Sequence, residues 1–388
     1  MLLTVTGALS LAIWLYLFLA RGGFWRMRPD ACSGAPGAPA PSVTAVVPAR
    51  NEADVVGHSV ASLAAQRYAG EFHIILVDDA SDDGTAAIAR QSAPGLLVIS
   101  APPLPPGWTG KMWAVAEGVR TATSDYLLLT DADIVHPPEH VAALVARAQE
   151  GGYDLVSYMV RLHCRSLAEQ ALIPAFVFFF FLLYPPVWIR DPRRRTAGAA
   201  GGCILIRRAA LERIGGIARI AGELIDDCAL ARAVKDSGGR VWLGLSDTAV
   251  SLREYRTFGE IGRMISRSAY TQLGYSPLVL AGTVAGLAVT YLAPPLLTLL
   301  APRGAASGMG AMAWLLITAT YWPAVRYTTR HWFWAPLLPL IALFYMSATI
   351  HSAVAHWRGR GGMWKGRTAC GAANPGCNRL SGGTGPHL

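Results

Sequence analysis

The sequence predicts an α/β domain with a mostly parallel central sheet of the nucleotide-binding type, placed between apolar helices that span a membrane. Two observations predict this architecture. Strand and helix signals alternate through residues 41–255, as they do when helices connect parallel strands. Long apolar runs without Asp, Glu or Lys lie before and after that region, at 2–20 and within 277–355. We therefore expect an N-terminal anchor, a central α/β domain and a C-terminal transmembrane region.

The composition supports membrane attachment. Only 15% of the 388 residues are charged and 53% are apolar, whereas soluble domains carry about 25% charged residues. A net charge of +9 could indicate nucleic acid, but the basic clusters at 21–28, 190–195 and 358–367 adjoin apolar runs. We therefore expect anionic lipid headgroups as the partner of these clusters and no nucleic acid.

The N-terminal anchor is predicted over residues 1–24. Its apolar stretch, 2–20, approaches the roughly 20 residues that cross a bilayer. A cleaved signal peptide is the alternative, but basic residues follow the stretch instead of preceding it. The positive-inside rule then places the N-terminus outside and the α/β domain in the cytoplasm.

The C-terminal membrane region, 277–355, contains three apolar stretches, at 277–302, 309–325 and 332–355. Prolines at 294, 295, 336 and 339 are expected to break or kink the helices. Three spans would place the basic tail outside, so one stretch is expected to be re-entrant or interfacial, and the sequence leaves open which one. The tail, 356–388, is predicted to be basic and then disordered.

Two further segments are predicted to lie at the membrane surface. The apolar run 171–189 separates motifs that must share a compartment, which favours an interfacial helix over a span. Residues 256–275 interleave arginines with Ile261 and Ile265, as an amphipathic surface helix does. Arg253, just before them, is assigned to the same surface group; an arginine of this group could also reach a diphosphate, although the surface role is favoured.

Within the α/β domain, strands are predicted at 42–50, 72–79, 95–100 and 126–133, with helices at 52–66, 81–91 and 111–121 between them. Parallel sheets of this kind bind ligands at the carboxyl ends of their strands. Carboxylates occur at two of those ends, as Asp78–Asp79 and as Asp131 with Asp133.

These carboxylates are candidate ligand-binding groups. Asp78–Asp79 could accept hydrogen bonds from a base or a ribose, although an ordinary capped turn has the same composition. Asp131 and Asp133 follow an apolar strand and could hold Mg²⁺ or Mn²⁺ against a diphosphate; a solvated turn is the alternative. His136 and His140, close by, are expected at a helix start and on the surface.

Other candidates lie at helix starts. Lys111 opens a helix, where a cation is unfavourable unless an anion lies nearby, and no P-loop motif precedes it. Glu223 and Asp226–Asp227 precede an amphipathic helix; they could provide a general base, although acidic first turns are also common for dipole reasons. Small residues within 197–208 would allow a ligand to approach the backbone closely.

The six cysteines and nine histidines include no CxxC or HExxH pattern. The cysteines are therefore expected to be structural thiols in a reducing compartment, and no dedicated metal cage is expected.

In this order, VVPARNE, VDDASDDGT, GK, TDAD and DDCALARAVK resemble the family 2 glycosyltransferases, which have the GT-A fold. The resemblance covers residues 42–275 and implies inverting transfer from a nucleotide-sugar, usually a UDP-sugar, with a divalent metal. It implies Asp227 as the catalytic base, with Asp226 in place of the family's Glu, and Asp131 and Asp133 as metal ligands. The matching positions that would contact the nucleotide-sugar are Pro48, Arg50, Glu52, Asp78, Asp79, Lys111, Asp131 and Arg267.

The family's late motif is degenerate, because Arg267 fits but Ser268 replaces Trp and Met264 replaces the first residue. Transfer of a single sugar is therefore expected in place of processive synthesis. The anchor, PPGWTGK, REYRTF, RSAYTQLGYSP and WKGR further resemble the hopene-associated glycosyltransferases, up to about residue 368, where Thr368 replaces the family's usual Tyr. That resemblance implies a hopanoid or other polyisoprenoid alcohol as acceptor, at a bacterial cytoplasmic membrane.

Other functions remain open at this stage. A ceramide- or carotenoid-type glucosyltransferase would share the chemistry. A catalytically silent sugar-nucleotide sensor is disfavoured by the complete set of carboxylates. A transporter is disfavoured because the C-terminal spans contain no Asp, Glu or Lys.

Overall fold

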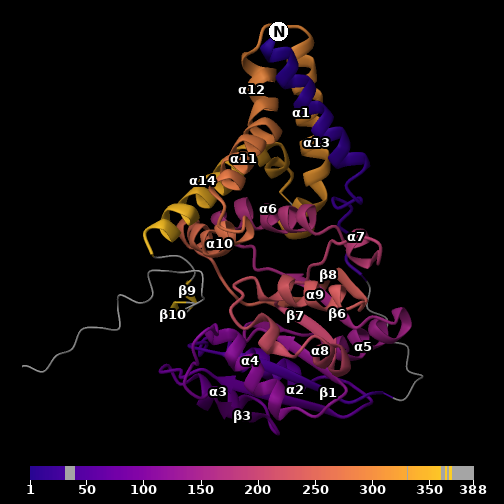
Figure 1. Cartoon of the computed structure of the whole chain (residues 1–388), viewed down its shortest axis with the longest axis vertical. Helices are drawn as coiled ribbons and strands as arrows, with labels where there is room; N and C mark the ends of the chain where they lie inside the picture. Colours follow the sequence, from indigo (N-terminus) through magenta and orange to yellow (C-terminus); the bar gives the residue numbers. More distant parts are fainter. Residues whose placement is uncertain (31–39, 330, 360–362, 365–366, 369–388) are drawn as a thin grey trace, which may run out of the picture.

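The computed structural model describes residues 1–30, 40–329, 331–359, 363–364 and 367–368. An α/β domain forms one end of the molecule, and a narrow group of long helices forms the other (Figure 1). The predicted disordered segment, 369–388, lies outside the described residues.

An eight-stranded sheet forms the centre of the α/β domain, in the order β3-β2-β1-β4-β7-β6-β8-β5. The first four strands of this order are parallel, as the sequence predicts. Beyond them the sheet is mixed, because β7 runs antiparallel to both β4 and β6. The strands are β1 Val43–Ala49, β2 Phe72–Asp78, β3 Leu97–Ser100, β4 Tyr126–Thr130, β5 Ile134–Val135, β6 Leu155–Arg161, β7 Cys203–Arg207 and β8 Val241–Ser251. A separate two-stranded ribbon pairs β9 Met363–Trp364 with β10 Arg367–Thr368.

Helices cover both faces of the sheet, which explains why every residue of β1 is buried. They are α2 Val56–Ala64, α3 Thr85–Ser92, α4 Gly110–Thr121, α5 His140–Gly151, α8 Arg208–Arg213 and α9 Asp226–Asp236, with a 3-10 turn, η1, at Ile217–Ile220. Helix α4 packs closely on the sheet: a β-carbon at Gly118 would lie 2.4 Å from Val46 Cγ1. Glycine is therefore required there for steric reasons.

Four segments are long and apolar enough to cross a membrane: Leu2–Leu19 (α1), Leu167–Arg190, Pro277–Leu300 and Trp332–Trp357. Pro277–Leu300 comprises α11 Pro277–Leu287, a π-turn (η2) at Ala288–Leu292 and α12 Ala293–Leu300. The π-turn directly precedes Pro294–Pro295, whose rings lack the N–H groups of a regular helix. Helix α13, Ala305–Thr328, is not one of the four, although it packs along α1 and α12.

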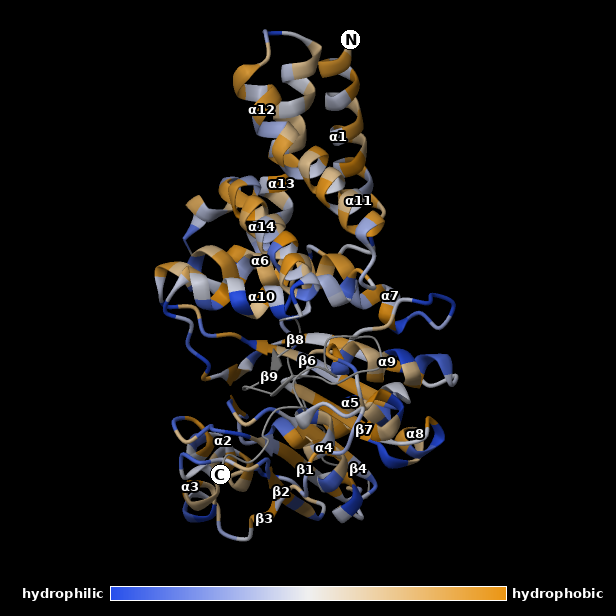
Figure 2. Cartoon of the chain, turned by 60° about the vertical axis from the view of Figure 1, so that its left-hand side comes forward, coloured by the Kyte–Doolittle hydropathy of each residue, from blue (hydrophilic) through white to orange (hydrophobic). Residues whose placement is uncertain are grey.

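Prolines also shape the last helix. A 3-10 turn (η3, Trp332–Leu337) contains Pro336 and precedes α14 Leu338–Trp357, which has Pro339 in its first turn. Orange hydrophobic segments predominate along the long helices, interspersed with paler ones, whereas the α/β domain contains more blue hydrophilic segments (Figure 2).

A layer of helices lies between the two parts. Helix α6, Leu167–Leu183, lies across the direction of α1 and α13 in both views (Figures 1 and 2), and Tyr184 and Pro185 separate it from α7, Pro186–Arg190. Helix α10, Phe258–Gln272, packs on α6 and α14. It begins with a capping box between Thr257 and Glu260, and Ile261 and Ile265 are its buried aliphatic residues. The amphipathic pattern of the sequence therefore corresponds to a helix with one buried face.

Candidate active site

A cavity opens at the carboxyl ends of β1 and β4, where α4 and α9 begin. Its polar side is formed by Lys111, Asp131, Asp226 and Asp227. The remaining lining comprises Pro48, Met112, Val115, Leu129, Thr130, Gly201, Ile204, Ile217, Ile220 and Leu230. Five of the lining residues, Pro48, Lys111, Asp131, Asp226 and Asp227, were singled out from the sequence, and they come from four separate segments of the chain.

Lys111 lies at the centre of the polar side. The Thr109 hydroxyl caps α4 by accepting from the N–H of Met112, which places Lys111 in the first helical turn. Lys111 Nζ lies 3.0 Å from Asp131 Oδ1 and 3.1 Å from Asp226 Oδ2. Burial disfavours its charge, but the carboxylates of Asp131, Asp226 and Asp227 outweigh this and raise the pKa of Lys111. The position of Lys111 at a helix start implied nearby anions. In this structure those anions are the carboxylates of Asp131, Asp226 and Asp227.

Asp227 is held by backbone groups. The N–H of Gly201 donates to Asp227 Oδ2 (2.9 Å), and the N–H of Cys228 donates to Oδ1 (2.7 Å). Burial first, and then the Asp226 carboxylate, raise the pKa of Asp227 to about 6, against the opposing effect of Lys111. A β-carbon at Gly201 would lie 3.4 Å from Asp227 Oδ2 and 3.5 Å from Lys111 Nζ. Because Gly201 has no side chain, its backbone N–H can approach the Asp227 carboxylate directly.

Asp133 points to a different set of partners. Ser251 Oγ donates to Asp133 Oδ2 (3.1 Å), and Arg253 Nε lies 3.4 Å from the same oxygen. Arg253 Nη2 also donates to both carboxylate oxygens of Glu52, at 2.6 Å. Burial opposes the charge of Arg253, but Glu52 and then Asp133 raise its pKa. Arg253 therefore connects two of the predicted site residues.

The carboxylate pair fits a hard divalent cation. Asp131 and Asp133 offer only oxygen donors, and each pairs with a cationic side chain in this structure, so these carboxylates can hold positive charge. Burial, with the neighbouring Asp133 and Asp226 carboxylates, raises the pKa of Asp131, while Lys111 opposes the shift. A cation bound here would replace contacts that Lys111 and Arg253 make in this structure.

Asp78 and Asp79 are buried at the end of β2, with 8% and 2% of their surface exposed. Asp78 Oδ2 accepts from the N–H of Ser81 (3.3 Å), whereas Asp78 Oδ1 has no hydrogen-bond partner within the described part of the chain. Arg50 donates to the carbonyl oxygen of Asp79 and lies 3.6 Å from its carboxylate. A buried acceptor without a partner is costly, which makes Asp78 Oδ1 a candidate acceptor for a ligand N–H or O–H.

Two residues singled out from the sequence lie outside the cavity lining. Arg267 is exposed on α10 and is not among the lining residues, so its contact with a nucleotide-sugar stays a prediction. Glu223 is also exposed and does not line the cavity. The surface role expected for His136 and His140 is wrong: both are buried beneath β4 and β5, although His140 does begin α5.

Arg253 was not identified as a site residue from the sequence. Its position among the arginines that precede α10 indicated a surface helix, and its partners Glu52 and Asp133 are more than 100 residues away in the sequence. The sequence feature that could have identified Arg253 is its position just after strand β8, at the edge of the sheet where the other site residues gather.

Comparison with known proteins defines the class. Residues 44–215 match the model of the family described as glycosyl transferase family 2. Over 118 residues the chain is 32% identical to an undecaprenyl-phosphate 4-deoxy-4-formamido-L-arabinose transferase of Enterobacter sp. (strain 638), covering 29% of this chain. The chain spans 35% of the length of that relative.

A solved structure with a similar fold is a mannosyltransferase of Pyrobaculum calidifontis, PcManGT, in complex with GDP-mannose and Mn²⁺. It is 20% identical, with a TM-score of 0.55, over 90% of this chain and 98% of that one. The α/β domain therefore has the GT-A fold, and its residues 44–215 match the glycosyl transferase family 2 model.

Proposed function

We propose that the chain is a membrane-bound inverting glycosyltransferase that moves one sugar from a UDP-sugar to a hydroxyl group of a membrane lipid, a hopanoid or another polyisoprenoid. The observation that carries the proposal is the contact between the carboxylate site and the apolar helix layer. Tyr184, at the end of α6, lies close enough to Cys228 and Asp227 for both to act electrostatically on its hydroxyl group. Gln272 of α10 donates to the same Tyr184 hydroxyl (2.8 Å).

A second contact joins the same two regions. Glu169 of α6 is buried and accepts from the N–H of Tyr255 (2.7 Å). Tyr255 lies two residues after Arg253, which pairs with Asp133. The membrane-facing helices are thus tied to both carboxylate groups of the site, so a lipid moving along α6 and α10 would bring its headgroup to the cavity. A soluble acceptor would not need such a layer.

The proposed binding site for the nucleotide-sugar donor lies at the carboxyl ends of the strands. Asp78 Oδ1 would accept an N–H or O–H of the nucleoside, with Pro48, Arg50 and Asp79 beside it. Lys111 would move from Asp226 toward the diphosphate, which offers it a higher local negative charge. Arg267 would act only from the membrane side, because it does not line the cavity.

Asp227 is proposed as the general base. Its backbone hydrogen bonds fix its orientation, and its raised pKa of about 6 makes it a stronger base than an exposed Asp while leaving it ionised at pH 7. Asp227 would remove the proton of the acceptor hydroxyl as its oxygen attacks the anomeric carbon, which inverts the configuration. Asp226, which pairs with Lys111 in this structure, would hold that lysine near the cavity until the diphosphate binds.

Asp131 and Asp133 would hold the divalent cation, Mg²⁺ or Mn²⁺, which would neutralise negative charge on the leaving diphosphate. The PcManGT structure contains Mn²⁺ with a nucleotide-sugar, which supports a metal in a protein of this fold. Release of Arg253 from Asp133 would then leave the guanidinium paired with Glu52.

For the location, we propose a multi-pass protein of the bacterial cytoplasmic membrane with its catalytic domain in the cytoplasm. Four segments that are long and apolar enough to span support the membrane part, and the relative that acts on undecaprenyl phosphate supports a lipid acceptor. Basic residues that follow α1 support the orientation.

The test uses the full-length protein in detergent with labelled UDP-glucose, UDP-N-acetylglucosamine or GDP-mannose, each with Mn²⁺. Separate reactions would contain a hopanoid alcohol, a polyprenyl phosphate, a ceramide or a carotenoid alcohol. We expect label in the organic phase with the hopanoid, and a mass spectrum of that lipid plus one hexose or N-acetylhexosamine. Glu223→Gln, at an exposed carboxylate near the site in sequence, is the matched control for Asp227→Asn.

The acceptors distinguish the outcomes. Product with only ceramide, only carotenoid or only polyprenyl phosphate would retain sugar transfer to a lipid but contradict the proposed acceptor. Nucleotide binding without transfer to any lipid would favour a sugar-nucleotide sensor and contradict the proposed function.

A further inference from the structure

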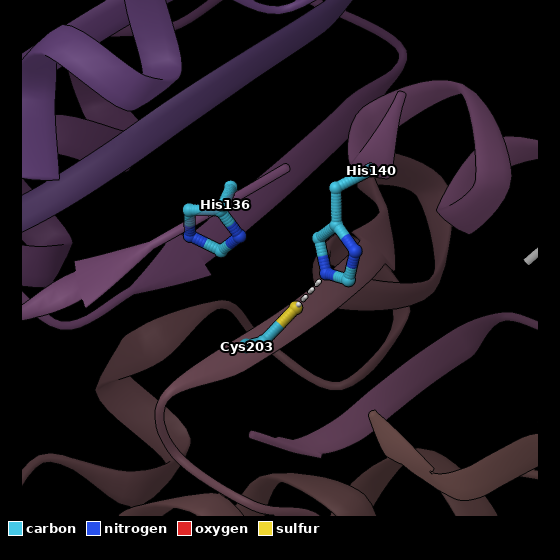
Figure 3. A group of neighbouring side chains, drawn as sticks. All are labelled: His136, His140 and Cys203. Carbon is cyan, nitrogen blue, oxygen red and sulfur yellow. Dashed lines mark hydrogen bonds between the residues drawn. The ribbon is translucent and has the colours of Figure 1, made fainter. Parts of the chain in front are cut away.

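Three buried side chains with metal-binding atoms meet beneath the carboxylate site. His136 follows β5, His140 begins α5 and Cys203 begins β7 (Figure 3). One ligand atom from each lies within 4.8 Å of the other two. Their exposed fractions are 2%, 1% and 0%, so all three side chains belong to the interior of the protein.

The hydrogen bonds of His136 determine which of its nitrogens carries the proton. Thr130 Oγ1 donates its single proton to the carbonyl oxygen of Gly202 (2.8 Å). At its 2.9 Å contact with His136 Nε2, Thr130 must therefore accept, which places a proton on Nε2. His136 Nδ1 then bears a lone pair, and it has no hydrogen-bond partner within the described chain. In metal sites, a ligating histidine is usually oriented by this kind of bond from its other nitrogen.

The second histidine faces the thiol. His140 Nε2 lies 3.3 Å from Cys203 Sγ, a separation that two ligands of one metal ion can adopt. Figure 3 shows this contact and the ring of His136 turning a nitrogen toward the same space. Both rings are buried, and a neutral imidazole ring can donate a nitrogen lone pair to a metal ion.

We propose that His136, His140 and Cys203 form a binding site for one soft d10 metal ion, Cu⁺ or Zn²⁺. Thiolate and imidazole are ligands that these ions prefer, whereas Mg²⁺ and Mn²⁺ prefer the oxygen donors of Asp131 and Asp133. Binding forms the metal–sulfur bond as the Cys203 thiol releases its proton to solvent. With Cu⁺ the buried group is then electrically neutral, which favours Cu⁺ over Zn²⁺ at this depth.

The site would stabilise the floor of the glycosyltransferase cavity. Thr130 directly precedes Asp131 and hydrogen-bonds Gly202, whose neighbour Gly201 donates to Asp227. A metal ion that joins the β5–α5 segment to the start of β7 would therefore fix the segment that follows Asp131 and Asp133 and the Gly201–Gly202 backbone that hydrogen-bonds Asp227. This role does not depend on which sugar or lipid the enzyme uses.

The experiment loads reduced, untagged full-length protein with Cu⁺ or with Zn²⁺, in excess Mg²⁺ to occupy carboxylates. After removal of unbound ions, metal content is measured by mass spectrometry. We expect about one ion per chain and a higher Tm for the loaded protein. The protein should retain Cu⁺ in the presence of the chelator bicinchoninate more strongly than it retains Zn²⁺ in the presence of a comparable zinc chelator. Cys203→Ser and His136→Asn should lose that ion, whereas the control variants Cys164→Ser and His58→Asn should retain it.

Equal metal content in the wild type and Cys203→Ser, or none in the wild type, would overturn the proposal. A second measurement does not depend on the variants folding. X-ray absorption of the loaded wild type should show one sulfur at about 2.3 Å and two nitrogens at about 2.0 Å if the ion is Zn²⁺. A spectrum without a sulfur ligand, with either ion, would also overturn it.

Discussion

Lys111→Met should move the acid limit of sugar transfer to higher pH. In the wild type, Asp227 has a pKa of about 6, so the proposed base gains a proton and activity falls as the pH drops through about 6. The Lys111 ammonium is one of the groups that oppose protonation of Asp227. Its removal leaves the carboxylates of Asp131, Asp226 and Asp227 together without a cation, and this favours the protonated form of Asp227.

The magnitude follows from the ion-pair distances. For unit charges 3.1 Å apart, the Lys111–Asp226 separation, Coulomb's law gives about 1 kcal/mol in water and about 5 kcal/mol at an effective dielectric constant of 20. Both side chains are 21% exposed, so the interaction lies between these limits. For Asp227, which does not pair directly with the lysine, we take about 1.4 kcal/mol, equal to about one pKa unit.

The assay is the pH dependence of kcat/KM for lipid glycosylation between pH 5 and 8, because this ratio reports ionisations of the free enzyme. We expect the acid limb near pH 6 in the wild type and in Lys111→Arg, which keeps the charge. In Lys111→Met we expect it near pH 7, with a lower plateau. A limb that stays in place in Lys111→Met, or that moves to lower pH, would refute the electrostatic account of Asp227.

Three further variants test other parts of the account. Asp133→Asn should lower Mn²⁺-dependent transfer by about 100-fold or more while the chain remains folded, since it removes one of the two proposed cation ligands; unchanged metal dependence would contradict the assignment. Arg253→Met should destabilise the protein, because the buried Glu52 carboxylate loses a partner at 2.6 Å, and its Tm should fall by about 2–4 °C per kcal/mol; restoration by Arg253→Lys would support a charge effect. Gly118→Ala should cost about 1–3 kcal/mol of unfolding free energy, because the new β-carbon would lie 2.4 Å from Val46 Cγ1, and an unchanged denaturation midpoint would contradict the packing.

Much of the catalytic domain could be predicted from short-range patterns. The strands β1, β2 and β4 are apolar runs that end at polar residues, so both the elements and the edge that carries the site follow from the sequence. Lys111 at a helix start indicated a nearby anion, because a cation is unfavourable at the N-terminus of a helix. These signals are local, and the parallel pairing rule brings them together.

The remaining features depend on pairings that local patterns do not encode. Strand β7 runs antiparallel between β4 and β6, and no local pattern indicated this reversed strand within the mostly parallel sheet. Arg253 was assigned to a surface helix because its partners, Glu52 and Asp133, lie on distant segments. From the sequence, His136 and His140 were expected on the surface. Only the pairing of β7 within the sheet places Cys203 against them.

The most direct measurement of the central claim compares purified wild type with Asp227→Asn for transfer of labelled sugar from the nucleotide-sugar to the lipid. The anomeric configuration of the product is then read by NMR. The account predicts β-linked sugar–lipid from an α-linked donor, formed by the wild type and Glu223→Gln and reduced at least 1000-fold in Asp227→Asn. An α-linked product, or equal transfer by Asp227→Asn, would contradict it.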